Sequence, residues 1–395
     1  IFLADKEEDR KIGFGNHMGQ DVWQEVPGEY RSELRRLIVT QGDTEPASVE
    51  QQKYLGMSCP SNYDLRSLFQ VNVEEGRHLW AMVYLLHAYF GRDGREEAEE
   101  MLLRHSGDVD KPRILEAFNV PTEDWLSFFM FTFFQDRDGK FQLTSLAESG
   151  FDPLSRSCRF MLTEEAHHMF VGESGVGRVV ERSAQLSAEN DTLEIGRHGG
   201  IPLAMIQKWI NFHFSICLDL FGQEKSTNAA NFYSMGLKGR YNENKIEDDH
   251  LLNNDGFLVP DLQNGKVIMS EISALTAINE RLRNDYRDDC QKGVDRWNRI
   301  IEKANVDFKL TLPHIAFNRN IGTFQDNDFD LEGNLISAEE FAANKDTWMP
   351  NSKDREFVKS LMQRVVEPGK MAGWIAPPSR GIQGKDIEYE YVILH

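Results

Sequence analysis

Two Glu-x-x-His pairs place a carboxylate and an imidazole one helical turn apart at two separate points of the chain. Glu75 precedes His78 in the first pair, and Glu165 precedes His168 in the second. Each pair lies at the centre of a row of mostly apolar residues with 3-4 spacing, which predicts that both pairs face the core of a helical bundle. Burying either group without a partner is costly, and a metal ion removes that cost by binding both groups.

Two further acids extend this pattern. Glu45 precedes Glu75 by 30 residues. Asp136 precedes Glu165 by 29 residues, and both of these acids also lie in apolar helical rows. Two helices that carry Glu-x-x-His, with one carboxylate from each of two other helices, form the ligand set of a carboxylate-bridged di-metal centre in a four-helix bundle. The predicted ligands are Glu45, Glu75, His78, Asp136, Glu165 and His168.

The ligand types restrict the metal. Carboxylates with two imidazoles and no thiolate suit iron or manganese and disfavour a structural zinc site. Neighbouring residues offer other choices of ligand, but only the six named above keep the two halves of the pattern in register. The alternatives are Glu164 with His167, Asp138 in place of Asp136, and Asp43 or Glu50 in place of Glu45.

Four helical blocks must bring these ligands together. The predicted blocks are 64–91, 122–149, 154–189 and a first block around Glu45. Pro46 directly follows a predicted ligand, and a proline inside a helix removes a backbone hydrogen bond. We therefore expect a local break there that turns Glu45 inward. A further apolar helix over about 201–221 is expected to pack against the bundle, with His213 as a core residue.

The remaining chain predicts a lead-in and an extension around the bundle. The predicted regions are 1–26 (irregular lead-in), 27–225 (helical bundle) and 226–395 (α+β extension). Within the extension, Asn264-Gly265 is a hairpin turn signal between two strand-like runs. A long helix over about 274–305 and strand-like runs at 308–312 and 389–394 complete the expectation.

The segment 328–339 matches several positions of an EF-hand calcium loop. No convincing helix is predicted before it. A glycine turn that leads into a helix capped by Ser337 explains the same residues. We prefer the helix cap, and a calcium site stays the alternative.

Composition sets broad limits on function. The chain has 395 residues, with 64 Asp and Glu against 44 Lys and Arg, which argues against a general affinity for nucleic acid or an anionic membrane. No apolar stretch approaches the length of a membrane span. The four cysteines are widely spaced and suit reduced thiols in the cytoplasm. The chain begins at Ile1 in mid-pattern, so we expect a natural N-terminal segment to precede it, and the oligomeric state stays open.

Five motifs resemble one family closely. The motifs are Thr-Gln-Gly-Asp-Thr-Glu-Pro at 40–46, Val-Glu-Glu-Gly-Arg-His-Leu-Trp at 73–80, Asp-Arg-Asp-Gly-Lys-Phe at 136–141, Leu-Thr-Glu-Glu-Ala-His-His at 162–168, and Trp-Ile-Ala-Pro-Pro at 374–378. Together they resemble the oxygenase component of benzoyl-CoA 2,3-epoxidase. The resemblance extends through the whole chain.

This resemblance implies a mainly α fold: a ferritin-like four-helix bundle with a di-iron centre, plus the C-terminal α+β extension. It implies two iron ions held by the six predicted ligands, with Gln41 as a catalytic residue beside Glu45. The implied monooxygenase reaction takes benzoyl-CoA and O2 to the 2,3-epoxide and water, in aerobic benzoate breakdown. Two electrons would come from a separate NADPH-dependent reductase that carries FAD and an iron–sulfur cluster.

The substrate contacts are less defined by the sequence. An aromatic run beside Asp136 could line a pocket for the benzoyl ring, or simply pack in the core. That run is Phe128, Phe129, Met130, Phe131, Phe133 and Phe134. Coenzyme A must meet basic side chains, and the loop-borne candidates are Lys238, Arg240, Arg319 and Arg380.

Other interpretations of the ligand set are a different di-iron oxidase and a protein without catalysis. A desaturase or the radical-generating subunit of ribonucleotide reductase would use the same ligands. The latter needs a tyrosine beside the iron, and Tyr89 is about three helical turns from His78. Iron storage or a metal-stabilised structural bundle is the third interpretation, and the large C-terminal region speaks against storage.

Overall fold

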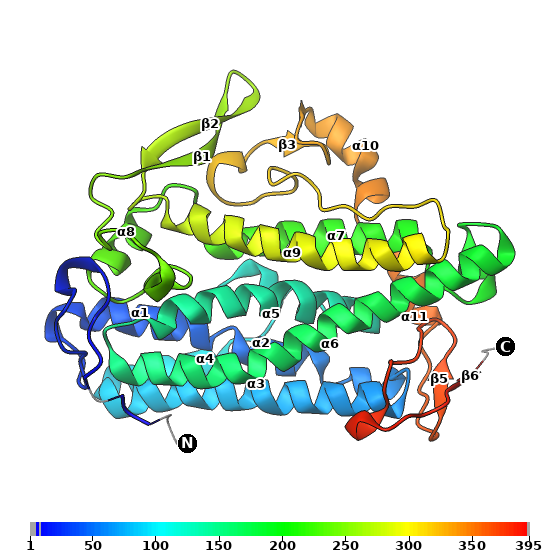
Figure 1. Ribbon diagram of the computed structural model, residues 1–395, viewed down its shortest axis with the longest axis horizontal. Helices are drawn as coiled ribbons and strands as arrows, with labels where there is room; N and C mark the ends of the chain where they lie inside the picture. Colours follow the sequence, from blue (N-terminus) through cyan, green and yellow to red (C-terminus); the bar gives the residue numbers. More distant parts are fainter. Residues whose placement is uncertain (1–4, 8, 393–395) are drawn as a thin grey trace.

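Long helices that lie side by side form the centre of the protein (Figure 1). The computed structural model describes residues 5–7 and 9–392. The helices are α1 (Arg31–Gly42), α2 (Glu45–Gln52), α3 (Asn62–Tyr89), α4 (Gly91–Leu103), α5 (Trp125–Ala147), α6 (Asp152–Asn190), α7 (Leu203–Leu218), α8 (Thr227–Ser234), α9 (Ile278–Lys303), α10 (Ala338–Trp348) and α11 (Ser352–Ser360). The prediction of a mainly helical fold is confirmed.

Helix α5 is buried along most of its length because α6, α7 and α9 all pack against it. Its closest neighbour is α6, and glycine makes that approach possible. A Cβ atom added at Gly172 of α6 would lie 2.3 Å from the backbone nitrogen of Phe133 on α5. A Cβ added at Gly175 would lie 2.1 Å from the ring of Phe129. The two backbones therefore meet where no larger residue fits.

The first predicted block is divided into two helices, as expected from Pro46. Helix α1 ends at Gly42, and α2 begins at Glu45 with the proline in its first turn. Because proline has no N–H group, it cannot continue the hydrogen bonds of α1, but its fixed φ suits the start of a new helix. Helix α3 packs against both α1 and α2, so all three reach the same part of the core.

The C-terminal part combines helices with small sheets. Helix α9 packs against α6 and α5, and α7 packs against α5 (Figure 1). Strands β1 (Gly256–Gln263) and β2 (Lys266–Ser273) pair antiparallel. Asn264 and Gly265 join them with φ of 51° and 75°, the left-handed backbone that a tight hairpin turn requires. The predicted hairpin is confirmed, whereas the division of the chain at residue 226 stays a prediction.

One of the two predicted strands is wrong. Residues 308–312 are irregular, because side chains of neighbouring helices take the backbone groups that a partner strand would take. Asn298 accepts from the N–H of Leu310 at 2.8 Å, and Gln207 accepts from the N–H of Thr311 at 2.9 Å.

The run at 389–394 contains β6 (Glu390–Val392), which pairs in parallel with β5 (Lys370–Ala372). Residues 393 and 394 lie outside the described residues. Within the described residues, the predicted strand is thus present as a parallel pair with β5.

The segment 328–339 forms a small hairpin and a helix cap. Strands β3 (Asp328–Phe329) and β4 (Leu335–Ile336) pair antiparallel, and the carboxylate of Asp330 accepts hydrogen bonds from backbone N–H groups of its own loop. The hydroxyl of Ser337 then accepts from Glu340 and caps α10. Within the described residues, the element directly before the segment is a short 3-10 turn and not an α-helix. The helix-cap interpretation fits this arrangement.

Several smaller expectations are also met. Cys59, Cys158, Cys217 and Cys290 are all free and buried. His213 is a core residue, and burial lowers its pKa to about 3. Within the described ranges, the structure contains no helix with both the length and the apolar character for a membrane crossing.

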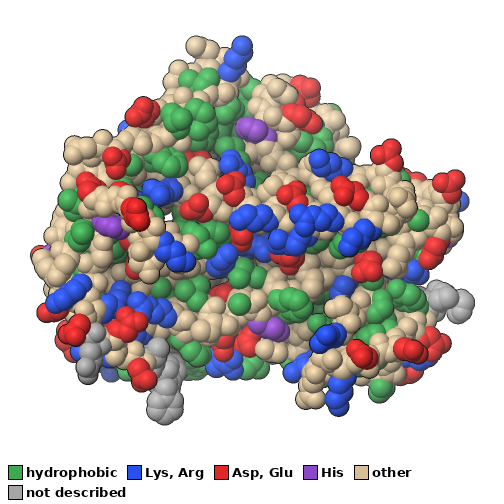
Figure 2. Space-filling view, in the orientation of Figure 1, with side chains coloured by type: hydrophobic (Ala, Val, Ile, Leu, Met, Phe, Trp, Pro, Cys, Tyr) green, Lys and Arg blue, Asp and Glu red, His purple; other side chains and the backbone are tan. Residues whose placement is uncertain are grey.

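The outer face of α9 carries both signs of charge. Figure 2 shows Lys and Arg side chains gathered over this part of the surface, with Asp and Glu between them. The exposed residues of its C-terminal half include Lys292, Asp295, Arg296, Arg299 and Glu302. This mixture is typical of a solvated helix surface rather than of a uniform basic patch.

Candidate metal centre

The six side chains predicted as ligands converge in the core between α2, α3, α5 and α6. Their exposed fractions range from 0% for His78 and His168 to 7% for Asp136. Four helical segments that are far apart in the chain therefore bring four carboxyl groups and two imidazoles to one place.

Three carboxylates surround the inner nitrogen of His78. Its Nδ1 atom lies 3.5 Å from Glu45 Oε2, 3.6 Å from Glu75 Oε2 and 3.6 Å from Glu165 Oε1. These contacts join α2, α3 and α6 at one point. A single ion at this point would have one nitrogen and three oxygen atoms within reach.

His168 has a matching environment on the other side. Its Nδ1 atom lies 3.6 Å from Glu75 Oε1, 3.6 Å from Glu165 Oε2 and 3.8 Å from Asp136 Oδ2. Glu75 and Glu165 thus each direct one oxygen to each histidine. Glu45 belongs to the first position, and Asp136 belongs to the second. The arrangement has two centres joined by two shared carboxylates.

The ligand atoms fit a pair of metal ions. Glu45, Glu75 and His78 have atoms within 4.8 Å of one another, and so do Glu75, Asp136 and His168. Four atoms that face this space have no hydrogen-bond partner among the described residues: Nδ1 of both histidines, Oδ2 of Asp136 and Oε2 of Glu165. Buried polar atoms rarely stay unpaired, and metal ions would satisfy these atoms.

The outer nitrogen of each histidine is held by an acid from the opposite helix. His78 Nε2 lies 3.1 Å from Glu164 Oε2, and His168 Nε2 lies 3.0 Å from Glu74 Oε2. Such hydrogen bonds fix the tautomer and the orientation of a metal-binding imidazole. His167 also contacts Glu74, at 3.2 Å. Glu164 and His167 thus lie behind the ligand set, although Glu74, His167 and His168 form a third group of potential ligand atoms.

The electrostatics of the cluster favour a cation. Burial and the nearby charge of Glu75 raise the pKa of Asp136 well above its usual value. Burial likewise raises the pKa of Glu45, to about 7. Burial alone would lower the pKa of His78, but the hydrogen bond to Glu164 and the nearby carboxylates Glu45 and Glu75 raise it well above the usual value. These shifts favour protons on Asp136, Glu45 and His78, and metal ions would replace such protons.

The alternative acids are engaged elsewhere. Asp43 accepts from the N–H of Ile114 at 2.6 Å and lies 3.4 Å from Arg113. Glu50 pairs with the same arginine at 3.0 Å. Asp138 accepts from the side chain of Gln142 at 3.0 Å. These partners account for the three acids, which supports the register chosen from the sequence.

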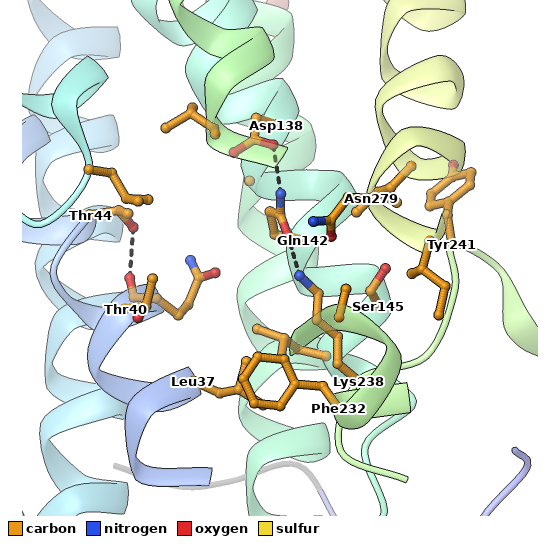
Figure 3. A pocket seen from close by; sticks show the side chains of 18 of the residues that line it. Leu37, Thr40, Thr44, Asp138, Gln142, Ser145, Phe232, Lys238, Tyr241 and Asn279 are labelled. Atoms are coloured by element: carbon orange, nitrogen blue, oxygen red, sulfur yellow. Dashed lines mark hydrogen bonds between the residues drawn. The ribbon is translucent and has the colours of Figure 1, made fainter. Parts of the chain in front are cut away.

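A cavity of about 1410 Å³, including its open part, adjoins the cluster (Figure 3). Its lining includes four of the six predicted ligands, which are Glu45, Glu75, Asp136 and Glu165. It also includes exposed residues, among them Arg36, Asn228 and Asp285, so the cavity connects the cluster with solvent. The arrangement offers a path for a substrate whose reacting end must reach the buried centre.

Gln41 lies where the cavity meets the cluster. Its Nε2 atom donates to Glu45 Oε1 at 3.0 Å, and its side chain lines the cavity. The hydroxyl of Thr44 donates to the carbonyl of Gln41 at 2.7 Å. Gln41 is therefore placed to hold one carboxylate of the cluster and to contact a ligand in the cavity.

For the aromatic run of α5, the structure favours the core-packing interpretation. The aromatic run of α5 is buried in the core, and none of its members lines this cavity. The reason is that these residues lie nearer the N-terminal end of α5, where α6, α7 and α9 cover them. The cavity instead lies along the polar part of α5. Its lining residues on α5 are Gln135, Asp136, Asp138, Gly139, Gln142, Ser145 and Leu146.

Of the four candidate coenzyme contacts, Lys238 and Arg240 line the cavity, and Arg319 and Arg380 do not. The guanidinium of Arg240 pairs with Glu243 and with Asp248 at 2.5 Å each. Arg319 pairs with Asp219 at 2.5 Å and with a second acid.

Arg380 is exposed and lies outside the cavity lining. Sequence reasoning missed Arg36 and Arg281, which line the cavity from α1 and α9 and form no ion pair with another described residue. No motif links two arginines on such distant helices. The position of these two arginines at one cavity is visible only once the helices are assembled.

Comparisons with known proteins identify a relative of the whole chain. No family model matches the chain. The benzoyl-CoA oxygenase component B of Aromatoleum evansii is 60% identical over 395 residues, an alignment that covers 99% of this chain and 84% of that protein. Identity at this level over nearly the whole chain establishes common descent and a common fold. The chain therefore belongs to the benzoyl-CoA oxygenase component B family.

Proposed function

We propose that this protein is a di-iron monooxygenase that converts benzoyl-CoA and O2 to the 2,3-epoxide, with electrons from an NADPH-dependent reductase that carries FAD and an iron–sulfur cluster. One observation carries the proposal: two shared carboxylates and two imidazoles surround a buried space that opens to a substrate-sized cavity. The proposed fold is the ferritin-like bundle, and the proposed location is the cytoplasm. Membership of an oxygenase family argues against iron storage.

Each residue of the cluster has a proposed task. Glu75 and Glu165 would bridge two iron ions, Glu45 with His78 would complete one position, and Asp136 with His168 would complete the other. Two iron ions held in this way supply the reductive activation of O2 that organic side chains cannot perform. Burial of all six groups keeps bulk water away from the reacting atoms, which protects against wasteful side reactions.

The cavity would bind the acyl thioester with its ring toward the cluster and its coenzyme toward solvent. Gln41, which donates to Glu45, would keep that carboxylate in place while the ring approaches. Arg36 and Arg281 are available for the phosphate groups of coenzyme A, because neither forms a direct ion pair within the described residues, although the charge of Asp285 lies near Arg281. Arginine binds phosphate oxygens with geometry that lysine cannot match.

Iron content separates the ligand set from its neighbours. Glu165→Ala is expected to abolish iron loading, because it removes a carboxylate shared by both positions. Glu164→Ala is the matched control: it is expected to retain most of the iron when iron(II) is in excess, because it removes only the support of His78. Iron per chain and far-UV circular dichroism, measured on both variants, check this. The reverse pattern of iron contents would shift the ligand register by one residue.

Substrate dependence tests the reaction. With iron(II), the reductase and NADPH present, O2 consumption should depend on benzoyl-CoA, and product analysis should show one oxygen atom added to the ring. Equal O2 consumption with and without benzoyl-CoA would contradict the proposed substrate. Iron loading without any turnover would instead favour a non-catalytic role.

A further inference from the structure

One wall of the cavity holds a lysine that forms no direct ion pair with a described carboxylate. Lys238 lies in the loop after α8, and its ammonium donates to Gln142 Oε1 on α5 at 2.5 Å. Gln142 in turn donates from Nε2 to Asp138 Oδ1 at 3.0 Å. Figure 3 shows these three side chains in line along the cavity wall. All three line the cavity that also contains part of the ligand cluster.

The hydrogen bonds leave donors free on the ammonium. A lysine ammonium carries three N–H groups, and Gln142 accepts one of them. Lys238 forms no ion pair with any described residue. Because Asp138 accepts from the amide nitrogen of Gln142, the amide oxygen must face the lysine. This chain holds the ammonium in position while its other N–H groups remain available to a ligand in the cavity.

The position of Lys238 suits a particular atom of the substrate. Gln142 follows Asp136 by six residues on α5, which corresponds to about 9 Å along the helix axis. A ligand whose aromatic ring reaches the ligand cluster then lies in the same cavity as Lys238 and Gln142. The group next to the ring in an aroyl thioester is a carbonyl, which accepts hydrogen bonds and has no donor.

We propose that the Lys238 ammonium donates a hydrogen bond to the carbonyl oxygen of the bound acyl thioester and so determines which ring carbons face the metal centre. The inference rests on the proposed function for its substrate class. Gln142 and Asp138 are positioning residues that hold the ammonium. A donor on the carbonyl withdraws electron density from the ring, which opposes oxygen attack on it, so the contribution is orientation rather than activation.

Binding measurements with a matched ligand pair test this inference. The ligands are benzoyl-CoA and S-benzyl-CoA, in which a methylene replaces the carbonyl. Isothermal titration calorimetry of each ligand with the iron-loaded protein, without reductase, avoids turnover. Wild type is expected to bind benzoyl-CoA about tenfold more tightly, as one charge-assisted hydrogen bond would give. Lys238→Met is expected to bind both ligands with similar affinity.

Control variants separate this contact from general effects of charge. Lys245→Met removes an exposed lysine of the same region and should keep the wild-type preference. Lys238→Arg keeps a cationic donor and should retain part of the preference. Gln142→Leu removes the acceptor that holds the ammonium, and it should reduce the preference even if Lys238→Met does not fold. Because the ligand preference is a ratio, changes common to both ligands cancel.

The outcomes distinguish the two proposals. An equal preference for benzoyl-CoA in wild type and in Lys238→Met would overturn the inference, and so would a wild type without any preference. Both of these results would leave the proposed substrate intact. Failure of wild type to bind either ligand would overturn the proposed function together with this inference.

Discussion

The two bridging candidates, Glu75 and Glu165, are supported by a reciprocal arrangement of residues between α3 and α6. Each is preceded in the chain by a second glutamate, and that glutamate holds the histidine of the opposite helix. Glu74 of α3 therefore supports His168, and Glu164 of α6 supports His78. The same Glu-Glu-x-x-His pattern on both helices thus supplies two proposed ligands, the second Glu and the His, and a first Glu that holds the histidine of the other helix.

Loss of one support should weaken iron binding without abolishing it. Glu74→Ala removes the acceptor at His168 Nε2, so the imidazole loses its fixed tautomer. We expect iron(II) affinity to fall by about 10-fold to 100-fold, the usual effect of removing such a partner. Titration with iron(II) against a competing chelator measures this. Glu99→Ala on the exposed face of α4 is the control and should bind iron as wild type does. An iron affinity of Glu74→Ala equal to that of wild type would show that the hydrogen bond of Glu74 to His168 is dispensable.

Lys238 should also carry a stability cost that depends on pH. Burial lowers its pKa from 10.5 to about 8. Below about pH 8 the ammonium is charged in both the folded and the unfolded chain, so the folded chain bears the full cost of burying that charge. Between 8 and 10.5 the unfolded chain holds a proton that the folded chain has lost, so folding becomes more favourable as the pH rises.

Lys238→Met is therefore expected to be more stable than wild type by about 1–3 kcal/mol near neutral pH. That gain should shrink steadily as the pH rises above the folded pKa. Urea unfolding of both proteins at about pH 7 and about pH 10 measures the difference. Lys245→Met, with an exposed lysine, should match wild type at both values; a gain independent of pH would point to packing instead of charge.

The six proposed ligands and the two arginines Arg240 and Arg319 differ in how far their surroundings could be predicted from the sequence. The convergence of the six proposed ligands could be predicted because Glu-x-x-His within an apolar helical row is unusual and occurs twice at nearly equal intervals. The positions of Arg240 and Arg319 beside acids could not be predicted. Their partners, such as Glu243 and Glu224, neutralise them through contacts that only the folded chain forms.

At the scale of elements, helices were easier to predict than strands. Apolar periodicity over many residues located the long helices, and the turn chemistry of Asn264-Gly265 located the hairpin. The strand expected at 308–312 failed for a specific reason. Its residues have strand-like types, but Asn298 and Gln207 supply the hydrogen bonds from two helices. A short apolar run cannot reveal which partner its backbone will meet.

The close contact of α5 with α6 should depend on glycine. Gly172→Ala would place a Cβ 2.3 Å from a backbone nitrogen of α5, so one helix must shift. We expect a loss of about 1–3 kcal/mol in the free energy of unfolding, typical of overpacking. The shift would also move Asp136 relative to His168, so iron content should fall. Circular dichroism during thermal unfolding and iron analysis measure both effects.

Gly76→Ala is the matched control for that substitution. Gly76 lies in the middle of α3, and a Cβ there would meet no heavy atom within 4 Å. Alanine favours a helix over glycine by about 1 kcal/mol, so this variant should be as stable as wild type or slightly more stable. Equal losses in both variants would show that the α5–α6 contact tolerates a methyl group.

At the scale of the whole molecule, the net charge conflicts with the proposed ligand. The chain carries a formal net charge of −20, and coenzyme A carries several phosphate charges. A uniformly acidic surface would repel such a ligand. Arg36 and Arg281, which line the cavity from α1 and α9, can offset that repulsion locally. The binding of an anionic coenzyme would then depend on a few arginines rather than on the average surface.

This dependence leads to a measurable effect of salt. Arg281→Ala is expected to raise the KM for benzoyl-CoA by about tenfold while kcat changes little, because the arginine would contact phosphates and not the reacting ring. Salt screens exposed charges over about 10 Å at 0.1 M, so added salt should weaken the attraction between Arg281 and the phosphates and raise the KM of wild type. The variant lacks this attraction, so its KM should rise less with salt. Lys292→Ala removes an exposed charge from the same helix, outside the cavity lining, and should behave as wild type. Equal KM values for Arg281→Ala and wild type at low salt would place the phosphates elsewhere.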